Sequence, residues 1–101
     1  MNRRLELHEK LVEVLGSRNV YFQPPASIKM KYPAIVYERN DILTRHANNQ
    51  VYNRRVAYTV ILIDSNPDSE LVVKLSELPL CGFDRHFESD NLNHDVFTIY
   101  Y

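Results

Sequence analysis

The sequence predicts an α+β fold, a single small domain with a central, mostly antiparallel sheet of about four to five strands flanked by two helices. Two segments repeat apolar residues every three or four positions, which is the helical period. Five other segments are short, apolar or alternating, and rich in Val, Ile, Tyr and Phe, which is typical of strands. The order is α-β-β-β-α-β-β, and the chain of 101 residues has the length of one domain, residues 1–101.

The first element is predicted to be a helix. Its apolar stripe is formed by Leu5, His8, Leu11, Val12 and Leu15, and Leu7 and Val14 widen it. Gly16 ends the helix, because glycine takes the left-handed conformation that closes a helix at little cost. We interpret His8 as a residue packed at the rim of this stripe rather than as a ligand.

Three strands are predicted next. Val20–Phe22 is short and stops before Pro24, which cannot donate a hydrogen bond to a sheet. Residues 34–39 follow Pro33 and are apolar on both faces, as expected inside a sheet. Residues 54–63 form the longest and most apolar strand, which we expect at the sheet centre.

A polar segment, residues 40–53, separates the second and third of these strands. It is longer than the 2–5 residues usual for a hairpin loop, so we predict a mobile loop that a partner orders. Arg45 and His46 within it, and Arg54 and Arg55 at its base, are candidate contact residues. Consecutive strand residues point to opposite faces, so Arg54 and Arg55 share one patch only if the strand starts after them. A charged strand entrance is the alternative.

The second helix is predicted to begin at Asn66 as N-cap, with Pro67 at its first position, and to end at Pro79. Its buried stripe comprises Leu71, Leu75 and Leu78. Two strands follow, Phe83–Ser89 and His94–Tyr101, joined by a turn of hairpin composition in residues 90–93.

Two chemical sites can be assembled from the C-terminal third. A metal site would use His86, Glu88, His94 and Asp95. A turn at Asn91–Leu92 would place Glu88 opposite Asp95, with His86 one step away, but the spacing matches no recognised ligand motif, and a solvated hairpin face is favoured.

The second of these sites would be a nucleophilic catalytic site. It would pair the single cysteine, Cys81, with His86 or His94 and with Asp84 or Asp95. Cys81 lies between apolar residues, and burial at a turn is favoured.

Composition excludes several classes of function. Two glycines cannot build the loops that cradle phosphates, and the net charge of −1 provides no global attraction for DNA or anionic membranes. No apolar run approaches the roughly 20 residues that span a bilayer, and the N-terminal residues are too polar for a signal peptide. A single cysteine suits a reducing cytoplasm. We therefore expect no enzyme activity, no cofactor and no membrane partner.

Aromatic residues are concentrated in residues 20–37 and at the C-terminus. Tyrosine offers a large rigid contact with a polar tip and is enriched at interfaces. We therefore take Tyr21, Tyr32, Tyr100 and Tyr101 as candidate subunit contacts.

Three runs within positions 5–39 carry a family resemblance: LVEVLG at 11–16, VYFQPP at 20–25 and MKYPAIVY at 30–37. They resemble small neck and tail proteins of long-tailed bacteriophages, in the tail terminator or tail-completion group, also filed as head–tail joining or minor capsid proteins. The resemblance implies a structural virion protein that forms a hexameric ring, caps the tail tube and contacts the head connector. Genome DNA would pass through the ring without sequence-specific contact. The protein would be found in the virion neck, and in the host cytoplasm during assembly.

The chain is somewhat short for that group, which leaves a head-closure protein of the same neck as an alternative. Two alternatives come from other classes. One is a small hydrolase or metal-binding domain that uses the Cys81–Asp95 segment. The other is a small host-side binding domain, such as an antitoxin-like partner.

Overall fold

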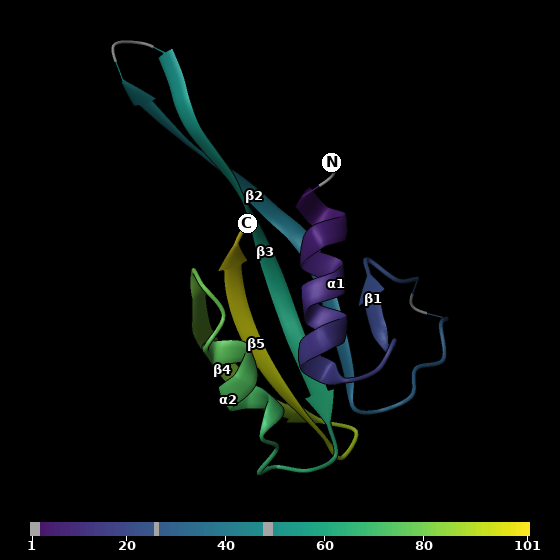
Figure 1. Cartoon of the computed structure of the whole chain (residues 1–101). Helices are drawn as coiled ribbons and strands as arrows, with labels where there is room; N and C mark the ends of the chain where they lie inside the picture. The colour runs from purple at the N-terminus through teal and green to yellow at the C-terminus, as the bar shows by residue number, and fades with distance from the viewer. Residues whose placement is uncertain (1–2, 26, 48–49) are drawn as a thin grey trace.

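The computed structural model describes residues 3–25, 27–47 and 50–101, with residues 41–55 described by their backbone alone. Figure 1 shows the chain. Its elements are α1 (Arg3–Leu15), β1 (Val20–Phe22), β2 (Ala34–Ala47), β3 (Gln50–Asp64), α2 (Leu71–Ser76), β4 (Cys81–Ser89) and β5 (Leu92–Tyr100). The five strands form one sheet in the order β1-β2-β3-β5-β4, and only the β1–β2 pair is parallel. The predicted α+β fold and element order are confirmed.

Both helices pack on the same face of the sheet (Figure 1). Leu7, Leu11 and Leu15 of α1 point into the core, one helical turn apart. Alternate residues of the strands pack against these leucines from the sheet, and Leu75 of α2 joins them from the helix layer. The strand residues are Val20, Ile35, Tyr37, Tyr58, Val60, Leu62, Phe97 and Ile99. Leu5 was expected in the buried stripe, but it is 52% exposed, because the stripe is centred on Leu7 and Leu11.

The predicted loop at residues 40–53 is wrong, because β2 and β3 continue as paired strands through it. Their antiparallel register runs on from Asp41 opposite Ala57 to Ala47 opposite Gln50. Backbone hydrogen bonds between two strands need no apolar side chains, so a polar sequence does not end the pairing. A hydrophobic pattern therefore underestimates the length of such strands.

The continued strands form a two-stranded arm, defined here as residues 41–47 and 50–56. The pairing of β3 with β5 ends where Ala57 lies opposite Tyr100, so the described arm has no third strand. In Figure 1 the arm extends away from the helices and the other strands. It accounts for the elongated shape, with extents of 50 × 24 × 23 Å. We call the remainder of the molecule the body.

The second helix starts later than predicted, at Leu71, with Glu70 as N-cap and no side-chain capping bond. Asn66 instead takes part in two successive turns. Its backbone N–H donates to Asp64 Oδ1 at 3.0 Å, and its own Oδ1 accepts from the Asp68 N–H at 3.0 Å. Such local side-chain bonds offer the backbone an alternative to a helix, and here they delay the helix start.

The β4–β5 hairpin turns at Asp90 and Asn91, with Ser89 opposite Leu92. Both turn residues have positive φ, 53° and 62°, as a type I′ turn requires, and Asp and Asn are among the residues that tolerate it. The turn therefore lies one residue earlier than assumed. Glu88 lies opposite Asn93 and not opposite Asp95, which corrects the predicted register.

Candidate subunit interface

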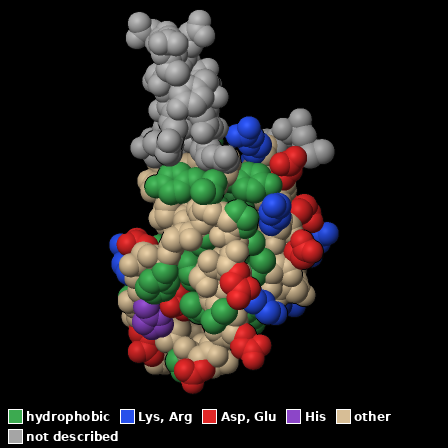
Figure 2. All heavy atoms as spheres, turned by 60° about the vertical axis from the view of Figure 1, so that its left-hand side comes forward, with side chains coloured by type: hydrophobic (Ala, Val, Ile, Leu, Met, Phe, Trp, Pro, Cys, Tyr) green, Lys and Arg blue, Asp and Glu red, His purple; other side chains and the backbone are tan. Residues whose placement is uncertain are grey.

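The outer edge of the sheet at β4 is exposed and partly apolar. Every residue from Gly82 to Ser89 is exposed. Phe83 is 54% exposed and Phe87 38%, and Leu80, just before the strand, is 52% exposed. Figure 2 brings this side of the molecule forward and shows apolar side chains among acidic ones. A cluster of exposed large apolar residues marks a contact surface more often than scattered ones do.

A bulge between Phe83 and Arg85 distributes this apolar surface over both faces of the sheet. Before the bulge, Phe83 lies opposite the core residue Phe97, with ring centroids 5.4 Å apart in an edge-on arrangement. After it, Phe87 lies opposite His94 and stacks on it at 4.6 Å, on the face without helices. A partner bound along the β4 edge would therefore contact one phenylalanine ring on each face of the sheet.

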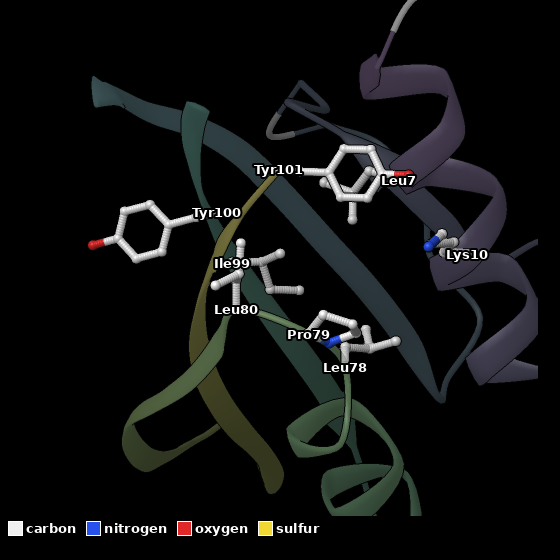
Figure 3. A pocket seen from close by; sticks show the side chains of 8 residues that line it. All are labelled: Leu7, Lys10, Leu78, Pro79, Leu80, Ile99, Tyr100 and Tyr101. Atoms are coloured by element: carbon white, nitrogen blue, oxygen red, sulfur yellow. The ribbon is translucent and has the colours of Figure 1, made fainter. Parts of the chain in front are cut away.

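A small pocket of about 110 Å³ lies beside this edge, between α1, the segment before β4 and the end of β5 (Figure 3). Its lining residues are Leu7, Lys10, Leu78, Pro79, Leu80, Ile99, Tyr100 and Tyr101. The Tyr101 ring reaches toward α1, whereas the Tyr100 ring points the other way. The Tyr101 hydroxyl donates to Glu6 Oε2 at 3.4 Å, and Lys10 Nζ lies 5.5 Å from the ring centroid. Tyr101 thus ties the C-terminus to α1 in the same chain, and Tyr100 remains exposed.

Leu80 occupies a strained backbone position. Its φ is +57°, in the left-handed region, which costs a residue with a Cβ about 1–2 kcal/mol. Its carbonyl accepts a hydrogen bond from the Tyr100 N–H at 3.1 Å, which fixes the start of β4 against the end of β5. An exposed apolar side chain held on a strained backbone is a candidate contact residue.

The face of the sheet opposite the helices carries a row of residues in register across the strands. Tyr21 lies opposite Val36, Val36 opposite Ile61, and Ile61 opposite Val96. Tyr21, Val36 and Ile61 are half-buried and Val96 is 2% exposed, although in the described chain both helices pack on the other face. The predicted contact residue Tyr21 belongs to this apolar row.

The other predicted contact residues lie far from β4 along the sheet. Tyr32 is 45% exposed in the connection from β1 to β2, at the opposite edge of the sheet. Arg45, His46, Arg54 and Arg55 belong to the arm, with their side chains outside the described part. The strand begins at Gln50, before the arginine pair, so the condition for one shared arginine patch is not met.

Sequence reasoning missed Leu80, Phe83 and Phe87 as exposed residues. The signal available was the pair of phenylalanines four residues apart, which in a regular strand share one face. That spacing indicates one buried face, and only the bulge separates the two rings. The exposure of Leu80 follows from its turn conformation, for which leucine gives no sequence signal.

The candidate nucleophile is not assembled. Cys81 packs against the core, and burial raises the pKa of its thiol. His86 lies five residues further along the same strand, a separation of about 16 Å at the usual rise per residue. A Cys–His pair needs hydrogen-bond distance, so these two residues do not form one.

The candidate metal cluster reduces to one pair. His86 Nδ1 and Asp95 Oδ1 are 2.7 Å apart, across the β4–β5 ladder. Glu88 lies opposite Asn93, and His94 stacks on Phe87 on the other face, so neither joins the pair. Within the described residues, no group of three or more His, Cys, Asp or Glu side chains is placed to hold a metal ion.

A polar network joins α1 to the core. The buried Tyr37 hydroxyl lies 2.7 Å from His8 Nδ1 and accepts a hydrogen bond from Arg4 Nη1 at 3.3 Å. Burial raises the pKa of Tyr37, while burial and the nearby Arg4 lower the pKa of His8. The hydroxyl therefore keeps its proton, and it donates a hydrogen bond to Nδ1 of the neutral imidazole in the tautomer that carries its proton on Nε2. The prediction that His8 packs at the rim of the helix agrees with this arrangement.

Together these features define a small α+β domain with both helices on one face of the sheet, a partly apolar edge strand and a projecting arm. No family model, curated protein or solved structure matches this chain. In the described part of the chain, the helices are too short and too polar to cross a membrane.

Proposed function

We propose that this chain is a structural protein of a phage neck, a ring-forming tail terminator that caps the tail tube and joins it to the head. The residues that resemble this group, positions 5–39, form α1, β1 and the first part of β2. They make up one half of the packed body. The resemblance thus covers a coherent structural unit rather than scattered positions.

The arm is the observation that carries the proposal. A two-stranded ribbon is marginally stable by itself in water and gains stability from a third strand or a packed surface. The described arm has no third strand, because β5 pairs with β3 only as far as Ala57 and the helices lie over the body (Figure 1). Only Val56, at the root of the arm, packs against the core in the described residues. An arm of this kind is suited to contact a second chain.

A ring supplies such a contact for every subunit. In a cyclic assembly, a patch on one subunit meets a different patch on the next, and the series closes when the rotation allows. The arm would make one contact with a neighbouring chain, and the exposed apolar residues around β4 offer a second, separate contact surface. Neither the arm nor the exposed apolar residues around β4 stabilise an isolated chain. This favours an assembly protein over an isolated binding domain.

The test is to purify the protein, with and without a tail tube protein, and to record its native mass and negative-stain images. We expect closed rings of six subunits, alone at high concentration or on the end of the tube. The matched control is a chain in which residues 43–55 are replaced by Asn-Gly, so that the arm is removed and the body retained. A strict monomer in both conditions would overturn the proposal. Rings that bind a head connector but never a tail tube would identify a head-closure protein instead.

A further inference from the structure

Charge is distributed unevenly between the two halves of the body. Residues 3–39 contain seven Lys and Arg and four Asp and Glu, a net charge of +3. Residues 64–101 contain two Lys and Arg and eight Asp and Glu, a net charge of −6. The overall charge of −1 conceals this asymmetry.

The fold converts this difference along the chain into a difference across the sheet. The basic half forms α1, β1 and the start of β2, and the acidic half forms α2, β4 and β5. Because the strand order is β1-β2-β3-β5-β4, the basic strands β1 and β2 and the acidic strands β5 and β4 lie toward opposite edges of the sheet, while α1 packs over the sheet between them (Figure 1). Six of the eight acids are exposed: Asp68, Glu70, Glu77, Asp84, Glu88 and Asp90.

Each edge also presents apolar residues beside its charges. At the acidic edge, Leu80 and Phe83 are exposed next to Asp84. At the basic edge, the connection between β1 and β2 exposes Ile28 at 37% and Tyr32 at 45%. Lys29 and Lys31 are exposed between these two residues. Both edges thus combine apolar and charged groups, with opposite signs of net charge. The acidic edge also contains Arg85, whose Nη1 lies 4.0 Å from Asp84 Oδ2.

We propose that the acidic edge at β4 of one copy docks against the basic β1–β2 connection of the next copy. This inference rests on the proposed self-assembly and specifies its contact. Like copies cannot pair the two acidic edges without repulsion, so the charges select a head-to-tail contact over a symmetric one. Head-to-tail contacts are the kind that generate rings. The apolar residues would supply affinity, and the charges would set orientation and the rate of encounter.

The experiment uses two charge-reversed variants of the full chain. The first, Asp84→Lys with Glu88→Lys, makes the acidic edge basic. The second, Lys29→Glu with Lys31→Glu, makes the basic connection acidic. All four residues are exposed, so circular dichroism and thermal unfolding should match the wild type.

Each variant alone should self-associate about tenfold more weakly than the wild type at low salt, measured by analytical ultracentrifugation. The difference should shrink in about 1 M salt, where the screening length falls to about 3 Å. An equimolar mixture should recover assembly, because every contact again joins opposite charges. A single chain that carries all four reversals should recover it as well. Glu13→Lys, an exposed reversal on α1, is the control to compare with Glu88→Lys alone, and it should have little effect.

The outcomes separate this inference from the proposed function. A wild-type protein that stays monomeric at every concentration, with or without a tail tube protein, overturns both. A wild type that forms rings while both variants assemble equally well overturns the edge contact alone. Recovery in the mixture would support it, since loss of folding in either variant cannot produce recovery.

Discussion

Strands β2 and β3 pass through two regions that are held together differently. In the body they lie between β1 and β5 and under the helices, and Tyr37 and Val60 are fully buried there. At the root of the arm, the Val56 carbonyl accepts a hydrogen bond from the Tyr101 N–H at 2.9 Å. Beyond Val56, strand pairing in the described chain joins β2 and β3 only to each other. One pair of strands thus changes from a packed sheet to a ribbon along its length.

The difference separates two causes of strand structure. In the body, apolar side chains drive burial, which contributes about 25 cal/mol for each Å² of apolar surface removed from water. In the arm, backbone pairing continues the strands without that contribution. Folding stability should therefore depend on the body, and self-assembly on the arm and the sheet edges. The predictions below follow this division, from the largest expected effect on the free energy of unfolding to the smallest.

Leu11→Ala should lower the free energy of unfolding most, because Leu11 is fully buried between α1 and the sheet. Truncation of a buried leucine costs about 2–5 kcal/mol of unfolding free energy through lost contacts and the cavity left behind. Leu5→Ala is the matched control on the same helix, since Leu5 is half exposed. Urea denaturation followed by circular dichroism measures both. Equal losses in the two variants would contradict the assigned orientation of α1.

Cys81→Ala tests whether Cys81, at the start of β4, has a structural role. Cys81 is partly buried against the core, so its truncation should lower the free energy of unfolding by about 0.5–3 kcal/mol. Ring formation and tail completion should persist in the variant. Because burial raises the pKa of the thiol, the folded protein should react slowly with a thiol-specific reagent. Loss of a measurable activity on thiol modification of the folded protein would refute the structural role.

The hydrogen bond between His8 and Tyr37 predicts a pH dependence at the base of α1. Folding lowers the pKa of His8 below its ordinary 6.5, so the unfolded chain binds the proton more tightly than the folded one. Stability must then fall as the pH drops through about 6.5, and the loss is complete below the folded-state pKa. His8→Gln retains an acceptor for the Tyr37 hydroxyl and removes this titration. Unfolding measured between about pH 7.5 and pH 5 should show a shallower dependence in the variant. Parallel curves would refute the sign or the source of the effect.

Removal of the arm should have the smallest effect on folding and a large effect on assembly. Replacement of residues 43–55 by Asn-Gly leaves Ile42 and Val56 as the pair that flanks a two-residue turn, in their existing register. We expect the free energy of unfolding to change by no more than about 0.5 kcal/mol, while rings and completed tails are lost. An unfolded variant, or a variant that still completes tails, would show that the arm is not a contact element.

Arg54→Glu with Arg55→Glu in the full-length chain sharpens this test. The variant keeps the length of the arm and changes its charge alone. Assembly should weaken at low salt and recover when salt screens the contacts. An effect that does not depend on salt would indicate that the arm acts through its backbone or shape instead.

Much of the body could be predicted because local rules and burial agree there. Leu11 and Leu15 of α1, Gly16 at its end, and the strand Val20–Phe22 lie where the pattern placed them, whereas Leu5 does not. The candidate site was only partly predicted. Tyr32 and Tyr100 are exposed as a contact residue must be, whereas Tyr101 is engaged with α1 in its own chain.

The sequence by itself determined the fold class and the order of the elements, since hydrophobic period and turn chemistry are local properties. The tertiary structure alone decided three things. Pairing across β2 and β3 turned a polar segment into an arm, because backbone hydrogen bonds do not depend on side-chain polarity. The bulge and the turn at Asp90 set which side chains face each other across β4 and β5, since a shift of one residue exchanges the two faces. The strand order carried the basic and acidic halves of the chain to opposite edges of one sheet, a separation that depends on contacts between residues distant in sequence.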